Sequence, residues 1–194
     1  MEQELTPSES LKLIETMIGQ AKHSFQRNSF YFLLWGVLLI AAMIVNYAMA
    51  MNGDPRGGYA WAVVGIVGGI ISWVHGAREG KRHQVTNVMD RMMMWLWLGF
   101  LATLLITMMG SGASGQPMTV GSIIVLTGLP TFVTGQLIRF RPLILGGVLF
   151  WVLGAVSYFV DTQTVALLYI AAIFFGYLVP GYLLKRQEDG LRTA

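Results

Sequence analysis

The chain has 194 residues, of which 55% are hydrophobic and only 12% are charged, and its mean hydropathy is +0.60. A water-soluble domain carries roughly 25% charged residues, so this composition argues against an ordinary soluble domain and favours a lipid surrounding. The net charge of +3 does not indicate nucleic-acid binding, because the basic residues lie at the ends of apolar runs and form no stripe. The sequence contains no cysteine, which excludes disulfides and thiolate metal sites.

The first predicted element is an amphipathic helix in the cytoplasmic N-terminal segment, residues 1–29. The sequence TPSE at residues 6–9 has the pattern of a capping box with proline in the first turn. Apolar side chains then recur at helical spacing and form one face. We expect this face to lie on the membrane interface or under the bundle, and docking of a second protein or a second copy is the alternative. The candidate docking face comprises Leu11, Ile14, Met17, Ile18, Ala21 and Phe25.

Six apolar runs follow, and each is about long enough to cross a bilayer as a helix, which takes about 20 residues. No Asp, Glu, Lys or Arg lies in the interior of any run. Such a charge would cost about 2.5–3.5 kcal/mol at a helix centre, and a soluble bundle would carry a polar stripe on each helix. The sequence therefore predicts an all-α, six-span transmembrane bundle at residues 30–185, followed by a tail at 186–194. The predicted spans are 30–51, 59–76, 92–110, 120–137, 143–160 and 165–184.

The distribution of basic residues predicts the orientation of this bundle. Twelve of the thirteen Lys and Arg residues lie in the N-terminal segment, in the second and fourth connections and in the tail, whereas the first connection has only Arg56. Because cytoplasmic loops carry the excess of Lys and Arg, both termini are predicted to be cytoplasmic. The three outer connections are short turns, so we expect no folded domain on that side.

Small residues recur at helix-packing spacing in several spans. In the second span Gly65 and Gly69 form a GxxxG motif, and in the fourth span glycine recurs every seven residues. Small residues let helix backbones approach closely in lipid. We expect close packing within one bundle, and self-association or contact with a partner helix is the alternative. The candidate helix-packing residues are Gly65, Gly68, Gly69, Ser72, Gly121, Gly128 and Gly135.

Polar side chains inside the spans gather near Pro130, which interrupts the fourth span, and Pro180 interrupts the sixth. A broken helix frees carbonyls that can line a polar cavity, although threonine hydroxyls can also satisfy a bend. We favour a structural kink. The alternative function is a channel or facilitator for a small neutral or weakly polar solute, whose path would follow Thr127, Thr131, Thr134 and Gln136.

His75, at the end of the second span, is the candidate for a membrane-embedded enzyme, which would need a polar cavity around it. An interfacial histidine that faces headgroups or a helix end is the plainer interpretation. The methionine cluster at residues 89–94 is interpreted as apolar packing, because a Cu(I) site has little else to draw on here. The chain has no paired carboxylates and no nucleophile, zinc or phosphate-loop motif. The sequence therefore predicts no catalytic residue, no cofactor and no metal site.

One resemblance lies in the first 36 residues. The sequence ESLKLIETMI at residues 9–18, followed by Ala21 and Lys22 and by FYFLLWG at residues 30–36, resembles the start of a family of small uncharacterised bacterial six-helix inner-membrane proteins. The resemblance implies a bacterial inner-membrane location and carries over no activity. The expected partners are membrane lipid and, at the cytoplasmic face, a second copy or another protein. The leading hypothesis is a non-enzymatic membrane component that docks a partner or self-associates through its N-terminal helix and its small-residue faces.

Overall fold

The computed structural model describes residues 28–82, 88–114 and 119–192, and all regular secondary structure in these segments is helical. The predicted all-α fold is confirmed for this part of the chain. The last predicted span is one continuous rod, in which the π-helical turn η2 joins α7 to α8. The helices are α2 (Asn28–Met51), the 3-10 turn η1 (Pro55–Gly58), α3 (Tyr59–Arg82), α4 (Val88–Ser114), α5 (Val120–Leu137), α6 (Arg141–Val156), α7 (Thr162–Ile173), η2 (Phe174–Leu178) and α8 (Val179–Arg192).

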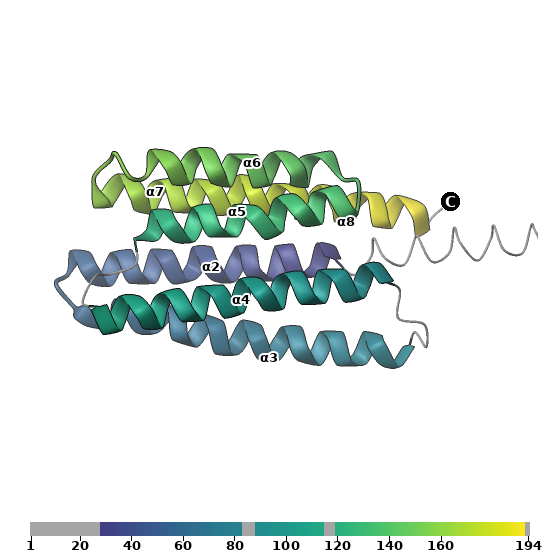
Figure 1. Ribbon diagram of the computed structural model, residues 1–194, viewed down its shortest axis with the longest axis horizontal. Coiled ribbons are helices and arrows are strands. Elements are labelled where there is room, and N and C mark those ends of the chain that lie inside the picture. The colour runs from purple at the N-terminus through teal and green to yellow at the C-terminus, as the bar shows by residue number, and fades with distance from the viewer. Residues whose placement is uncertain (1–27, 83–87, 115–118, 193–194) are drawn as a thin grey trace, which may run out of the picture.

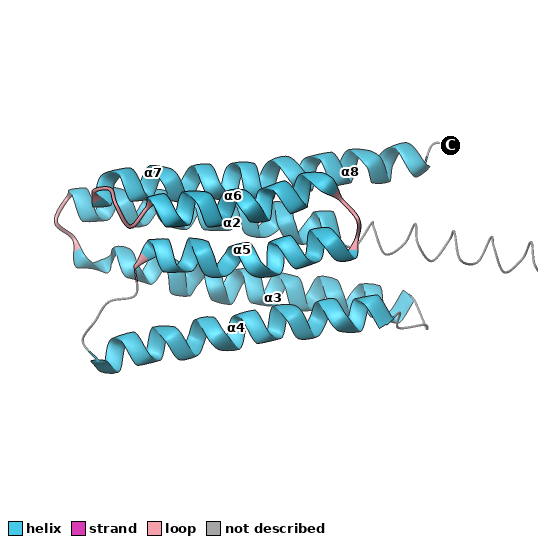
Figure 2. Ribbon diagram, turned by 45° about the horizontal axis from the view of Figure 1, so that its top comes forward, coloured by secondary structure: helices cyan, strands magenta, loops and turns pink. Residues whose placement is uncertain are grey.

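The helices lie side by side along the long axis of the molecule (Figure 1). Helix α2 packs against α3 on one side and against the α7–α8 rod on the other. Helices α5 and α6 form the most closely packed pair, and both contact the α7–α8 rod. Helix α4 lies at the edge of the bundle in the turned view and packs mainly on α5 (Figure 2). The fold therefore has a close-packed group of α2, α5, α6 and the rod, with α3 and α4 on its outside.

Five of the described helices are long and apolar enough to cross a membrane, and α6 is the shorter one. Helix α6 has 16 residues, so at about 1.5 Å per residue it is about 24 Å long, against a hydrocarbon core of about 30 Å. The predicted span 143–160 extends too far at its end, because the Tyr158 and Phe159 amides form turn bonds to Ala155 and Val156 instead of continuing the helix. The crossing of the membrane by α6 stays a prediction.

Helix ends follow local capping chemistry. The side chains of Thr119 and Asp161 accept amide hydrogen bonds at the starts of α5 and α7. Helix α3 runs to Arg82 and α4 begins at Val88, so both helices are longer than the apolar spans predicted within them. The predicted span 59–76 is the first part of α3, and the predicted span 92–110 is the middle part of α4.

The basic residues gather at one end of the bundle. The end of α3, the start of α4, the α5–α6 turn and the end of α8 all lie at this end, and η1 with Arg56 lies at the other (Figure 1). We call it the basic end. It follows from the antiparallel packing of neighbouring helices. Which side of the membrane it faces stays a prediction. The described basic residues at this end include Arg78, Arg91, Arg139, Arg141, Lys185 and Arg186.

Burial differs strongly between the two parts of the bundle. In the most apolar window of each helix, 44% of residues are buried in α5 and in the α7–α8 rod, but only 11% in α3 and 6% in α4. The exposed side chains of α3 and α4 are large and apolar, for example Ile66 and Met109. A face of this kind is stable in lipid or against another helix and not in water.

Candidate functional sites

The closest helix contact is a line of glycines between α5 and α6, which we call the α5–α6 seam. A Cβ at Gly128 would lie 2.5 Å from Trp151 and 3.0 Å from the Gly147 carbonyl oxygen. A Cβ at Gly135 would lie 2.6 Å from the Ile144 amide nitrogen. These glycines therefore let the two backbones touch, as small residues do in membrane bundles. The seam comprises Gly121, Gly128 and Gly135 of α5 with Gly147 and Gly154 of α6.

The small residues of α3 divide into two sets. Gly68 and Ser72 face α2, where a Cβ at Gly68 would lie 2.9 Å from the Trp35 ring and the Trp35 Nε1–H donates to Ser72 Oγ at 3.2 Å. Gly65 and Gly69 lie on another part of the helix surface, where an added Cβ would meet nothing within 4 Å. The structure therefore separates the GxxxG pair from the residues that pack α3 onto the bundle.

The threonines near Pro130 are buried between helices. The Thr127 hydroxyl donates to the Ile123 carbonyl at 2.7 Å, and the Thr131 hydroxyl donates to the Thr127 carbonyl at 2.8 Å. Such bonds to the preceding turn satisfy a hydroxyl without a cavity. The Thr134 hydroxyl is also buried and has no hydrogen-bond partner within the described part of the chain. Gln136 is exposed and does not join them.

A tyrosine of the α7–α8 rod lies beside these threonines, and Thr131 and Tyr177 form a buried hydroxyl cluster. The Tyr177 hydroxyl lies 3.5 Å from Thr131 Oγ1, and its ring packs edge-on against Phe32 and Phe150 at centroid distances of 5.4 and 5.2 Å. The Tyr169 ring packs edge-on against Trp61. The cluster therefore lies at the meeting point of α2, α5, α6 and the rod, enclosed by aromatic rings.

Pro180 accounts for the π-helical turn beside this cluster. Proline has no N–H to donate to the carbonyl four residues earlier, here Gly176, and its ring crowds that carbonyl. The Val179 N–H bonds to Phe174 five residues back, which defines the π turn. The Gly176 carbonyl lies against α6, where a Cβ at Gly146 would be 2.9 Å away. The predicted interruption is thus accommodated as a wider turn within one continuous rod.

His75 is packed by aromatic rings. Its imidazole stacks on Phe30 at a centroid distance of 3.9 Å and an interplanar angle of 23°, and Tyr31 packs edge-on at 5.7 Å. Both rings belong to the first turns of α2, whereas the threonines belong to α5. The structure therefore does not bring His75 together with the other polar candidates.

Sequence reasoning did not select Trp35, Tyr169 and Tyr177, because a single aromatic residue in an apolar run carries no periodic signal. Pro180 was the available signal for the tyrosines, since the carbonyl it frees lies one residue before Tyr177. No group of three or more His, Cys, Asp or Glu that could hold a metal ion occurs within residues 28–82, 88–114 and 119–192. The candidate docking face from Leu11 to Phe25 lies outside the described residues.

Comparison with known proteins identifies no family: no family model, curated protein or solved structure matches the chain. Helix length and hydropathy classify it instead. The protein is a multi-span helical membrane protein. The resemblance of its first 36 residues to small bacterial inner-membrane proteins stays a prediction, as does the type of membrane.

Proposed function

We propose that this membrane protein is a non-enzymatic component that self-associates laterally through the Gly65–Gly69 face of α3. The observation that carries the proposal is the open space at these two glycines. The described glycines of α2, α5, α6 and the rod each have a neighbouring atom within 4 Å of an added Cβ. Gly99 and Gly110 of α4 are also open, but they lie eleven residues apart and form no GxxxG pair. A GxxxG pair gives a second helix a flat surface for close approach. A second copy of α3 provides the same surface in the same membrane.

The loose attachment of α3 supports this proposal. Its inner stripe, which includes Gly68 and Ser72, packs on α2, and most of the remaining surface is exposed. Ala62 lies three residues before Gly65, so it belongs to the same stripe as the GxxxG pair. Ala62 is exposed as well. The contact would therefore use residues that the fold of one chain leaves unused.

The polar candidates give the alternatives less support. A solute path along the threonines of α5 would need hydroxyls that line a hydrated space, but Thr127 and Thr131 donate to their own helix and all three threonines are buried. An enzyme built on His75 would need a polar cavity, but the imidazole stacks on Phe30. Neither geometry prepares a reacting or conducting site, which favours a structural role.

Cysteine crosslinking tests the self-association directly, because the native chain has no cysteine. Ala62→Cys places a thiol on the stripe. Ala155→Cys is the matched control, since it replaces an exposed alanine of α6 near the same end of the bundle. We expect oxidation in native membranes to crosslink Ala62→Cys into dimers far more than Ala155→Cys. Equal crosslinking of the two variants would remove the proposal.

A second substitution tests whether the glycines form the contact. Gly69→Leu in the Ala62→Cys background should abolish most of the crosslinked dimer, because leucine prevents close helix approach. Gly99→Leu is the control, since Gly99 is an exposed glycine of α4 where an added Cβ also meets nothing within 4 Å. If Gly69→Leu and Gly99→Leu reduced the crosslinked dimer equally, the proposed contact face on α3 would be wrong.

The predicted N-terminal docking face would also serve assembly, independently of the α3 contact. Deletion of residues 1–25 is expected to change the proteins that co-purify in mild detergent or the oligomeric state. If the deletion changed neither of these nor the phenotype, the docking face would have no part in assembly, and the α3 contact would be judged on the crosslinking alone.

A further inference from the structure

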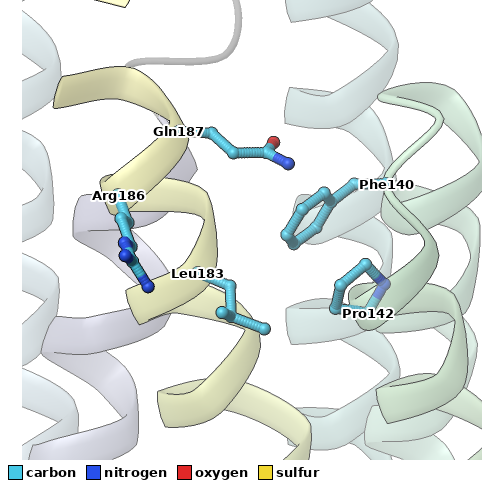
Figure 3. Close-up of a pocket in the computed structure, with 5 residues that line it drawn as sticks. All are labelled: Phe140, Pro142, Leu183, Arg186 and Gln187. Carbon is cyan, nitrogen blue, oxygen red and sulfur yellow. The ribbon is translucent and has the colours of Figure 1, made fainter. Parts of the chain in front are cut away.

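The basic end of the bundle has a cavity between the α5–α6 turn and α8. Its volume is about 430 Å³, within the range of about 300–1,000 Å³ typical of ligand pockets. Leu183 and Gln187 project from α8 toward Phe140 and Pro142, and Arg186, which also lines the cavity, runs along α8 on the side away from Phe140 in this view (Figure 3). Three of the five lining side chains are apolar and one is a cation.

The wall on the α6 side is the first turn of that helix. Phe140 is the N-cap residue, and its side chain makes no capping hydrogen bond. Pro142 has no N–H, and the amides of Leu143 and Ile144 both donate to the Phe140 carbonyl. The Arg141 amide is thus the donor left over in this turn, at the positive end of the helix dipole.

The described side chains around the cavity carry a net positive charge. Among the described side chains of residues 139–142 and 183–189, the cations are Arg139, Arg141, Lys185 and Arg186, and Asp189 is the one carboxylate. All five are exposed. An anion would be attracted to this end, whereas a cation would be repelled.

The apolar residues indicate what kind of anion fits. Leu183 is 37% exposed and Tyr182 is 61% exposed, so the apolar surface of the α7–α8 rod continues up to the cavity. The Phe140 side chain is buried and lines the cavity. A ligand there would have a phosphate beside Arg186 and Gln187, and hydrocarbon beside Leu183 and Pro142.

We propose that this cavity binds an anionic glycerophospholipid from the leaflet at the basic end. Its phosphate contacts the Arg186 guanidinium, the Gln187 amide and the first turn of α6, as basic pockets between membrane helices do with anionic headgroups. Its glycerol and first methylenes pack on Phe140, Pro142 and Leu183. Charge complementarity selects anionic over zwitterionic lipid, and the apolar wall selects lipid over a free phosphate ion.

Native mass spectrometry of the full chain in neutral detergent tests the site. Phosphatidylglycerol, phosphatidylcholine with the same acyl chains, and inorganic phosphate are titrated separately. We expect phosphatidylglycerol to bind most tightly and Arg186→Gln to weaken it about fivefold, the equivalent of about 1 kcal/mol for one basic residue. Lys185→Gln is the matched control, because it removes the same charge from the next residue, which does not line the cavity.

Three outcomes would overturn the proposal. Equal weakening by Arg186→Gln and Lys185→Gln would mean a diffuse surface attraction without a site. Equal binding of phosphatidylcholine and phosphatidylglycerol would mean that charge does not select the ligand. Competition by inorganic phosphate at the same concentration as the lipid would mean that the ligand is a soluble anion. None of these results bears on the crosslinking test of α3.

Discussion

Replacing Gly147 by alanine tests how closely α5 and α6 approach. A Cβ at this position would lie 2.6 Å from the N, Cα and Cβ atoms of Phe132. Because carbon atoms in contact lie about 3.5–4.0 Å apart, the two helices would have to separate by about 1 Å. Two of the three Phe132 atoms are backbone, so no side-chain rotation can relieve the overlap. Overpacking costs about 1–3 kcal/mol, and the better helix propensity of alanine offsets about 1 kcal/mol.

Taking the upper part of that range, we expect Gly147→Ala to lower the free energy of unfolding by about 2 kcal/mol. Gly99→Ala is the matched control, since an added Cβ there meets nothing within 4 Å and Gly99 lies on α4, outside the proposed α3 contact. It should raise the free energy of unfolding by up to about 1 kcal/mol through helix propensity. Equilibrium unfolding in dodecyl sulfate mixed micelles, followed by circular dichroism, measures both values. If Gly147→Ala matched the native chain or the Gly99→Ala variant, the seam would not have the close contact described above.

Three further predictions concern single side chains. Thr134→Val should stabilise the fold by about 1 kcal/mol, because it removes a buried hydroxyl that has no hydrogen-bond partner among the described residues. Thr131→Val should not stabilise the fold, because it breaks the hydrogen bond to the Thr127 carbonyl. The same unfolding assay compares the two variants, and destabilisation by Thr134→Val would mean that the Thr134 hydroxyl has a bound partner. The hydrogen bond from the Thr164 side chain is the largest cause that lowers the pKa of Asp161 below its ordinary 3.8, and the Thr164 amide bond also contributes. The stabilisation from this cap is therefore present at neutral pH and is lost as the pH falls through the lowered pKa, below about 3.8. Below this pH, the rate of amide hydrogen exchange at the start of α7 should rise in the native chain but not in the Asp161→Asn variant. The same rise in both proteins would mean that protonation of Asp161 is not its cause. Arg139 has a left-handed backbone conformation with φ of 54°. Arg139→Gly should therefore stabilise the protein by about 1 kcal/mol in thermal unfolding, because glycine adopts this conformation without strain. A loss of stability would mean that the arginine side chain contributes more than the backbone strain costs.

Much of the fold was predictable from single residues and their immediate neighbours. The apolar runs predicted the long helices, since each side chain contributes separately to the transfer from water to lipid. Thr119 and Pro142 mark helix starts through bonds or constraints within one turn. The end of α6 was predicted less well, because residues 158–160 are aromatic or aliphatic and yet do not continue the helix. Hydropathy reports what a residue prefers as surroundings and not whether its backbone stays helical.

The candidate sites were predictable only in part. The glycine spacing selected Gly121, Gly128 and Gly135, but the same spacing in Gly65 and Gly69 has a different outcome, with open space in place of a neighbouring helix. Residue type and period are the same in both cases. What differs is the helix that lies opposite, which no local pattern records.

The sequence alone determined that this protein lies in a membrane and that most of its basic residues gather at one end of the bundle. Both follow from the preference of each side chain for lipid or for water and from the preference of Lys and Arg for one side of the membrane. The reversal of chain direction at each short turn then brings these basic residues to the same end. Only the tertiary structure decided which face of each helix is inside. Helices that are apolar all round have no polar face to orient them, and lipid provides no hydrophobic force to choose one. The buried face of each helix is set by the fit of side chains against backbones. Glycines of α5 and α6 contact the facing backbone, and Trp35 packs against Gly68 and Ser72. The π turn lies beside the contact of Tyr177 with Thr131.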